Sequence, residues 1–217
     1  MSDDATLEAF RLADSFLPVG TYTVSYGLEQ FVADGRVDDA DELAALLETY
    51  LRRQVGPAEL VALRAAYSAA ENGDIDRLST IDGRLSAVTL AAEFRESAQQ
   101  SGDRLLSLQT ELREDDRLQA YADRVASDDA PGNYAVVLGV ATAVAGVPVR
   151  EACLLCCHGF LTGLLGAAQR LMSLGHTDAQ RILDDLRPVM AAAVADSADR
   201  AVDEMTPFAP LVDVLAA

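Results

Sequence analysis

The sequence predicts an all-α protein, a single-domain bundle of about eight to ten helices spanning residues 1–217. Apolar residues recur every three or four positions along almost the whole chain, and no segment alternates with period two for long enough to form a convincing strand. Half of the residues are hydrophobic, enough for one sizeable core. Between residues 131 and 175 only Arg150, Glu151 and Arg170 are charged, so this segment should be the interior.

The first boundary is an irregular corner at residues 14–27. Pro18 and Gly20 impose a turn between two apolar runs, because proline fixes φ and glycine permits conformations that other residues avoid. Small polar side chains and aromatic rings surround this turn, and Gly27 then opens a helix. A generic helical bundle does not need so specific a corner.

Capping and turn residues predict the next helices. Asp39 and Glu42 form a capping box that opens a helix, and we expect Gly56-Pro57 to interrupt that helix. The following helix ends at the turn of residues 72–74. The remaining helices of this half are expected at roughly 75–90, 90–112 and 115–126.

Two nearly uncharged helices, at roughly 134–145 and 149–173, form the expected centre of the bundle. We expect Gly175 to end the second helix in a left-handed cap. The last helix then starts at Thr177, and Pro188 should bend it.

The second central helix contains an uncharged run, residues 152–168, that raises the question of a membrane span. This run is shorter than the roughly 18 residues expected of a span, and it carries a histidine, three cysteines and a threonine. We therefore interpret it as a buried core helix, with Gly159 and Gly163 spaced to allow a close helix crossing.

The charge balance is strongly acidic: 35 acidic residues face 17 basic residues, a net charge of −18. Such a surface repels itself at low salt and is screened at molar salt, where the Debye length is about 3 Å. We interpret this acidic composition as typical of proteins from a halophilic cell with a high-salt cytoplasm. An acidic protein of a mesophile is the alternative. A nucleic-acid partner is not expected, because no basic patch is available to neutralise phosphates.

All of the basic residues are arginines, and the absence of lysine excludes several mechanisms. A Walker A loop, a Schiff-base lysine and a Ser-Lys dyad are impossible, so any GTP must be bound by another subunit. The acidic N-terminus does not resemble a signal peptide, and the three cysteines do not form a disulfide framework. A reducing cytoplasm is the expected location.

Cys153, Cys156, Cys157 and His158 form the one cluster of soft metal ligands in the sequence. On a helix the three cysteines share a face while His158 points away, so a four-coordinate site is poor geometry. Core packing is therefore the favoured role, and a cytoplasmic metal-binding protein using this cluster is the alternative function.

Four blocks of the sequence together resemble one family. Residues 12–29 read LADSFLPVGTYTVSYGLE, and Glu93 with Arg95 precedes SGDRLLSL at 101–108. YAVVLG at 134–139 and RLMSLGHTDAQ at 170–180 follow in the same order. This series is similar to the conserved signature of the urease accessory protein UreF family, and it covers roughly residues 10–205.

The resemblance implies a non-enzymatic assembly factor for the nickel centre of urease. Members are expected to form homodimers, to pair with a UreD/UreH-type accessory protein, to recruit the UreG-type GTPase and to pass nickel to apo-urease. No cofactor is expected on this chain itself, since the complex handles the nickel. A generic helical adaptor unrelated to urease is a third possibility.

The resemblance also implies which residues contact partners. In the tail, about 203–217, Asp203 replaces the family's histidine and no arginine follows Arg200, although Phe208 and Leu211 remain as apolar anchors. The expected partner-binding residues are Pro18, Gly20, Tyr22, Ser25, Gly27, Glu29, Glu93, Arg104, Asp203, Glu204 and Phe208.

Overall fold

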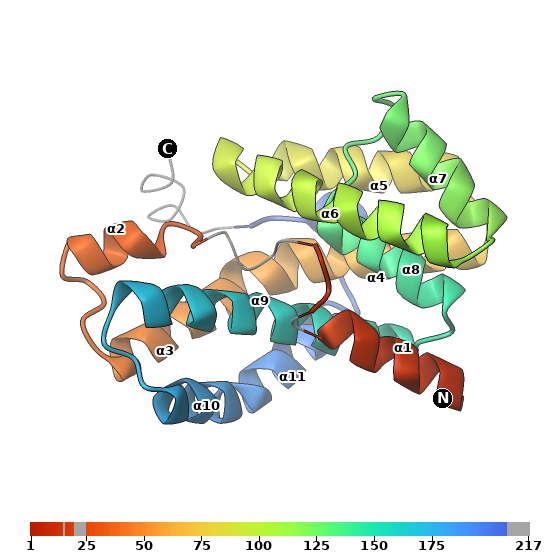
Figure 1. Cartoon of the computed structure of the whole chain (residues 1–217). Helices are drawn as coiled ribbons and strands as arrows, with labels where there is room; N and C mark the ends of the chain where they lie inside the picture. Colours follow the sequence, from red (N-terminus) through yellow and green to blue (C-terminus); the bar gives the residue numbers. More distant parts are fainter. Residues whose placement is uncertain (15, 20–24, 208–217) are drawn as a thin grey trace.

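The computed structural model describes residues 1–14, 16–19 and 25–207 of the chain. Within these ranges every regular element is a helix, which confirms the predicted all-α class (Figure 1). The elements are α1 (Asp3–Ala13), α2 (Leu28–Ala33), α3 (Ala40–Tyr50), η2 (Leu51–Glu59), α4 (Leu60–Glu71), α5 (Ile75–Val88), α6 (Ala92–Leu112), α7 (Asp116–Ala126), α8 (Tyr134–Val144), α9 (Val149–Leu171), α10 (His176–Asp185), α11 (Arg187–Asp196) and η3 (Val202–Glu204).

The helix that begins at Ala40 continues without a break to Glu71, so the prediction that Gly56-Pro57 interrupts it is wrong. The central part, η2, is a π-helix that contains Pro57. In a π-helix each amide donates a hydrogen bond to the carbonyl five residues earlier, and here the Leu60 amide donates to the Val55 carbonyl. Proline lacks an amide and its ring crowds the preceding turn of an α-helix. The π register accommodates it, and the chain therefore does not turn away.

The expected uncharged pair, α8 and α9, forms the centre of the bundle (Figure 1). Helix α8 packs against α4, α6 and α9, and residues 135–142 are all buried. Gly139 permits the close approach to α4, because a Cβ there would lie 2.5 Å from the carbonyl oxygen of Leu63. Helix α9 contacts α1, α2, α4, α10 and α11 as well.

Helix α9 is long and apolar enough, by length and composition, to cross a membrane. However, 56% of its most apolar window is buried inside the protein, against helices from both halves of the chain. It is therefore the core helix of this fold, as the sequence predicts.

Two boundaries in the last third differ from the prediction. Helix α9 ends at Leu171, and Gly175 has a φ of −72° rather than a left-handed conformation, because it is the N-cap of α10. Helices α10 and α11 separate at Leu186, so Pro188 does not bend one long helix. It lies in the first turn of α11, where a missing amide removes no helical hydrogen bond.

A buried carboxylate, Asp82 on α5, ties three parts of the fold together. It accepts hydrogen bonds from the Tyr121 hydroxyl at 2.6 Å, the Gly132 amide at 2.6 Å, and the Asn133 amide and side chain at 3.0 and 2.7 Å. Burial raises the pKa of Asp82, while these donors act in the opposite direction. Four donors and two oxygens match an ionised carboxylate, so this group is a structural anchor.

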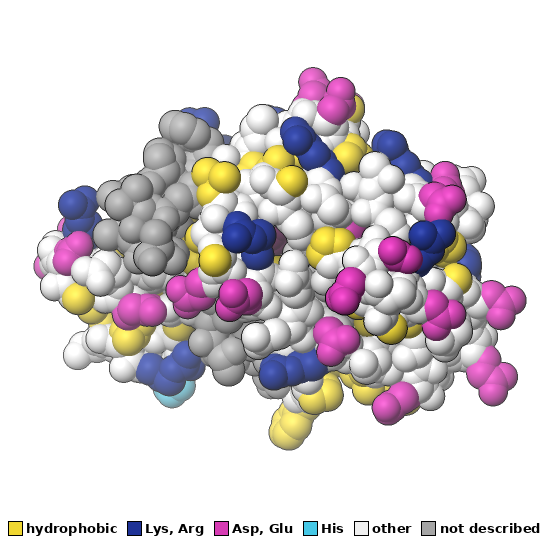
Figure 2. All heavy atoms as spheres, turned by 90° about the horizontal axis from the view of Figure 1, so that it is seen from above, with side chains coloured by type: hydrophobic (Ala, Val, Ile, Leu, Met, Phe, Trp, Pro, Cys, Tyr) yellow, Lys and Arg dark blue, Asp and Glu magenta, His cyan; other side chains and the backbone are white. Residues whose placement is uncertain are grey.

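Charge covers the outside of the molecule. Figure 2 shows acidic side chains spread over one face, with arginines between them. A buried exception is Glu8 on α1, which pairs with Arg11 and with Arg113 of α6 and accepts from Gln109. These hydrogen bonds and charges lower the pKa of Glu8 against the opposing effect of burial, and they attach α1 to α6.

Candidate functional site

The predicted corner is only partly within the described residues. Gly20 and Tyr22, and Phe208 of the tail, lie outside them. Pro18 is exposed between buried Leu17 and Val19. The apolar neighbours thus attach this end of the corner to the core, while the proline itself faces solvent.

The far end of the corner brings three predicted residues together. The Ser25 hydroxyl donates to the carboxylate of Glu29, which is exposed in the first turn of α2. Between them Gly27 is the N-cap of α2 and has a left-handed φ of 75°. A residue with a Cβ is strained in that conformation, which explains the glycine of the signature.

Tyr26, beside that glycine, also has a left-handed backbone, with a φ of 51°. This conformation is costly for a non-glycine residue, so its surroundings must hold it. The Tyr50 hydroxyl donates to the Tyr26 carbonyl at 2.5 Å, and the Tyr26 ring lies 4.8 Å from the ring centroid of Phe94 and 5.0 Å from that of Phe160. The left-handed backbone conformation therefore places the Tyr26 ring against Phe94 and Phe160 inside the protein.

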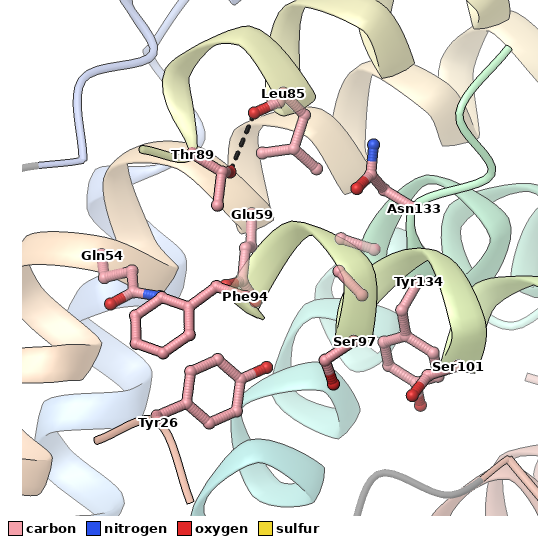
Figure 3. Close-up of a pocket in the computed structure, with 12 residues that line it drawn as sticks. Tyr26, Gln54, Glu59, Leu85, Thr89, Phe94, Ser97, Ser101, Asn133 and Tyr134 are labelled. Atoms are coloured by element: carbon pink, nitrogen blue, oxygen red, sulfur yellow. Dashed lines mark hydrogen bonds between the residues drawn. The ribbon is translucent and has the colours of Figure 1, made fainter. Parts of the chain in front are cut away.

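The Tyr26 ring lines a branched cavity that we term the Glu59 pocket. One branch, about 50 Å³, lies between the π-helix, α5, α6 and α8, and the other, about 40 Å³, lies along α9. Tyr26, Glu59 and Tyr134 line both branches, and Figure 3 shows how they are arranged with their neighbours. The other residues that carry the argument below are Gln54, Phe94, Ser97, Ser101, Cys156, Gly159 and Phe160.

Glu59 is the last residue of the π-helix, and the π-turn explains its position. Gln54 lies five residues earlier, and its side chain hydrogen-bonds to the Glu59 carboxyl group. Glu59 is half-buried at the surface of the cavity. Loss of hydration raises the pKa of this carboxyl to about 7, and the hydrogen bond with Gln54 opposes the shift. A π-turn of this kind is frequent at functional sites.

Three of the four sequence blocks meet at this pocket. The corner contributes Tyr26, the central helix contributes Phe94 and Ser101, and the apolar segment contributes Tyr134. These residues are distant in the sequence and come together only through packing of α6 and α8 around the corner. The fourth block, at 170–180, contributes no residue to the lining.

The remaining predicted partner residues are on the surface. Glu93 and Arg104 are exposed on α6. Asp203 and Glu204 are exposed on η3, which is attached to α5 where Arg84 donates to the Asp203 carbonyl. The completely buried side chain of Met205 follows, so the tail is anchored up to that point.

The cysteine cluster has the environment of core residues. All three thiols are buried, and burial raises the pKa of Cys153 to about 11, that of Cys157 to about 12 and that of Cys156 well above its usual range. Burial also lowers the pKa of half-buried His158. In the described part of the chain, no three His, Cys, Asp or Glu side chains are grouped to hold a metal ion. Thiols that stay protonated are poor ligands, so the geometry does not support the metal-binding alternative.

Comparison with known proteins identifies the family. The UreF family model matches residues 37–187. The chain belongs to the UreF family. It is 35% identical over 208 residues to the urease accessory protein UreF of Trichodesmium erythraeum, covering 96% of this chain and 90% of that protein. It is 32% identical to urease accessory protein UreF 1 of Brucella melitensis, with 97% and 87% covered, and 30% identical to the UreF of Lachnoclostridium phytofermentans, with 88% and 84% covered.

UreF proteins are non-catalytic accessory proteins of urease maturation, so this chain is not an enzyme. The family also implies a maturation complex with other accessory proteins. Sequence reasoning identified the corner but missed Glu59 and Gln54 of the pocket. Pro57 in an otherwise helical stretch indicates an irregular turn, but it specifies neither a π-helix nor which side chain faces inward.

Proposed function

We propose that this UreF-family chain is a cytoplasmic assembly factor for the urease nickel centre, acting as a homodimer in a high-salt cell. It bridges a UreD/UreH-type accessory protein and the UreG-type GTPase while nickel is delivered to apo-urease. The observation that carries the proposal is family membership over most of the chain. Nickel is the cargo of the whole complex, and no ligand role on this chain is needed.

The surface near the corner supports a role in protein contacts. On α1, Leu7 and Phe10 share one face and are 64% and 68% exposed, and Phe16 in the corner is 92% exposed. Large apolar side chains gathered in this way are typical of surfaces that bind other proteins. Phe16 is two residues before Pro18, so the signature itself carries an exposed apolar side chain.

The chain itself lacks the lysine of a phosphate-binding loop, so nucleotide chemistry belongs to the GTPase. Contacts with that partner influence it only by binding one of its conformations more tightly than another. This chain therefore contributes binding surfaces that couple its partners, and it does not catalyse a reaction itself.

A pull-down at molar KCl with the accessory GTPase and the UreD/UreH-type partner tests the proposal. High salt screens the self-repulsion of a chain with net charge −18. A stable ternary complex is expected. If well-folded protein binds neither partner, the bridging role is wrong even though the family assignment stands.

A double variant, Tyr22→Ala with Ser25→Ala, tests the corner. We expect unchanged helicity and weaker co-purification, by roughly tenfold or more, since interface residues of this kind are worth 1 kcal/mol or more. Ser68→Ala, at an exposed position of α4 outside the four signature blocks, is the control and should leave binding unchanged. Loss of helicity in the double variant would instead make the corner a folding element, and unchanged binding would remove it from the interface.

A further inference from the structure

We propose that the Glu59 pocket binds one ammonium or guanidinium group, carried either by a small free amine or by a lysine or arginine side chain of another protein. This inference concerns the chain's own cavity and does not depend on the bridging role. It follows from the charge, the aromatic lining and the size of the pocket.

The charge at the centre of the pocket favours a cation. Glu59 lines both branches, and its one hydrogen-bonding side chain, Gln54, is neutral. No arginine or histidine in the described ranges forms an ion pair with Glu59. A carboxylate removed from bulk water is stabilised by an opposite charge within a few ångströms. With an apolar or anionic occupant the Glu59 carboxyl group would keep its proton, whereas a cation stabilises the ionised form, so above about pH 7 the pocket favours positive charge.

The aromatic rings favour an organic cation. Tyr26 contacts the rings of Phe94, Phe160 and Tyr50, with centroids 4.8, 5.0 and 6.5 Å away. The rings of Tyr26 and Phe94 stand beside the cavity in Figure 3, with the hydroxyl of Ser97 across from them. Ring faces attract ammonium and guanidinium groups, and the hydroxyl supplies an acceptor for their N–H donors. The lining therefore offers both apolar contact and hydrogen bonds.

The size of the cavity agrees with a group of this kind. A cavity of about 50 Å³ is well above the roughly 10–15 Å³ needed to hold one water, so it has room for a small polar group. A guanidinium group has one carbon and three nitrogens, and the second branch, about 40 Å³, leaves room for part of a stem. A bare metal ion would need more ligands than this pocket offers, because the described residues contain no group of three His, Cys, Asp or Glu around it.

Gly159 offers a way to block the pocket without disturbing the fold. It lines the α9 branch, and a Cβ added there would meet nothing within 4 Å. The expectation that Gly159 allows a close helix crossing is therefore wrong, since this glycine faces the cavity. Gly83 on α5 is a matched control: it is exposed and helical, and a Cβ there also meets nothing within 4 Å.

The experiment is a titration of the full chain at molar NaCl and neutral pH, with binding monitored by NMR or by calorimetry. The probes are methylguanidine, N-acetylarginine amide and Ni²⁺ alone. We expect one-site binding of a guanidinium probe with a dissociation constant of about 1 mM. Glu59→Gln and Gly159→Ala should each weaken it at least about tenfold. Glu111→Gln, which removes an exposed charge on α6, and Gly83→Ala should not change it.

The two organic probes distinguish the source of the cation. Binding of methylguanidine with exclusion of the capped arginine identifies a small free amine as the ligand. Equal or tighter binding of the capped arginine identifies a side chain of another protein. The proposal is overturned if neither probe binds, if Glu59→Gln leaves the affinity unchanged, or if Ni²⁺ alone binds at Glu59.

The pH dependence of the unaltered protein provides a second test that needs no variant. Affinity should fall as the pH is lowered through about 7, because Glu59 then gains a proton. The other titratable groups around it are Tyr134, Tyr26 of the corner, and Cys156 and Cys157 of α9; burial raises the pKa of Cys157 to about 12. Burial raises the pKa of both Tyr26 and Cys156, so they remain neutral in that range. Affinity that does not change with pH would contradict a role for the carboxylate.

Discussion

Asp82 and Glu59 are two carboxyl groups in the interior of the same bundle, and their surroundings differ. Asp82 is fully buried and receives four hydrogen bonds, two of them from backbone amides of the loop before α8. Glu59 has one side-chain partner, Gln54, and faces a cavity. Burial raises the pKa of both groups; four donors oppose the rise at Asp82, and only Gln54 opposes it at Glu59, whose pKa is about 7.

The difference separates a structural carboxylate from one that is available for binding. Donors fixed by the backbone replace the lost hydration of Asp82 in every copy of the folded protein. Glu59 lacks that compensation, so its ionised form is costly until something positive arrives. The same substitution, carboxyl to amide, should therefore act in opposite directions at the two sites.

The largest effect is expected for Asp82→Asn. The new amide group would direct N–H donors at the Tyr121 hydroxyl and the Gly132 amide, which are donors themselves. The free energy of unfolding should fall by about 3 kcal/mol, as when a buried charged partner is lost. Urea denaturation at molar KCl measures it, with Asp103→Asn on the exposed face of α6 as the control. A loss no larger than that of the control would mean that Asp82 does not anchor the loop.

The effect of Glu59→Gln on the free energy of unfolding should have the opposite sign to that of Asp82→Asn, and it should depend on pH. The pKa of Glu59 is raised from 4.5 to about 7 in the folded protein, so folding favours the protonated form. The stabilisation from this proton is complete below about pH 4.5 and is lost as the pH rises through 7. Relative to the unaltered protein, the glutamine variant should gain about 2 kcal/mol in unfolding free energy between about pH 5 and pH 8. A parallel pH dependence of the two proteins would show that Glu59 is well solvated.

The smallest effect is expected for the two glycines. Gly83→Ala and Gly159→Ala should each raise the free energy of unfolding by about 0.5–1 kcal/mol, because alanine loses less backbone entropy in a helix. Neither added methyl group meets an atom within 4 Å. Thermal or urea unfolding of both variants measures the gain. Destabilisation by Gly159→Ala alone would mean that α9 packs tightly there and that the pocket is closed.

The prediction from sequence was accurate where local patterns decide the structure. The capping residue Asp39 opens α3, where its carboxylate accepts from the amides of Asp41 and Glu42, and the uncharged segments become α8 and α9. Four local predictions are wrong: the helix interruption at Pro57, the close helix crossing at Gly159, the left-handed cap at Gly175 and the helix bend at Pro188. At each of these positions a proline or glycine permits more than one local structure, and packing of distant helices selects among them.

The sequence by itself determined the helical class, the uncharged core, the exclusion of lysine chemistry and the family, because periodicity, composition and motif order are all properties of the linear chain. Only the tertiary structure decided that Tyr26, Phe94 and Tyr134, from three separate blocks, line one pocket around Glu59. The physical reason is that burial and the resulting pKa depend on which helices surround a side chain. No local pattern around residue 59 contains that information.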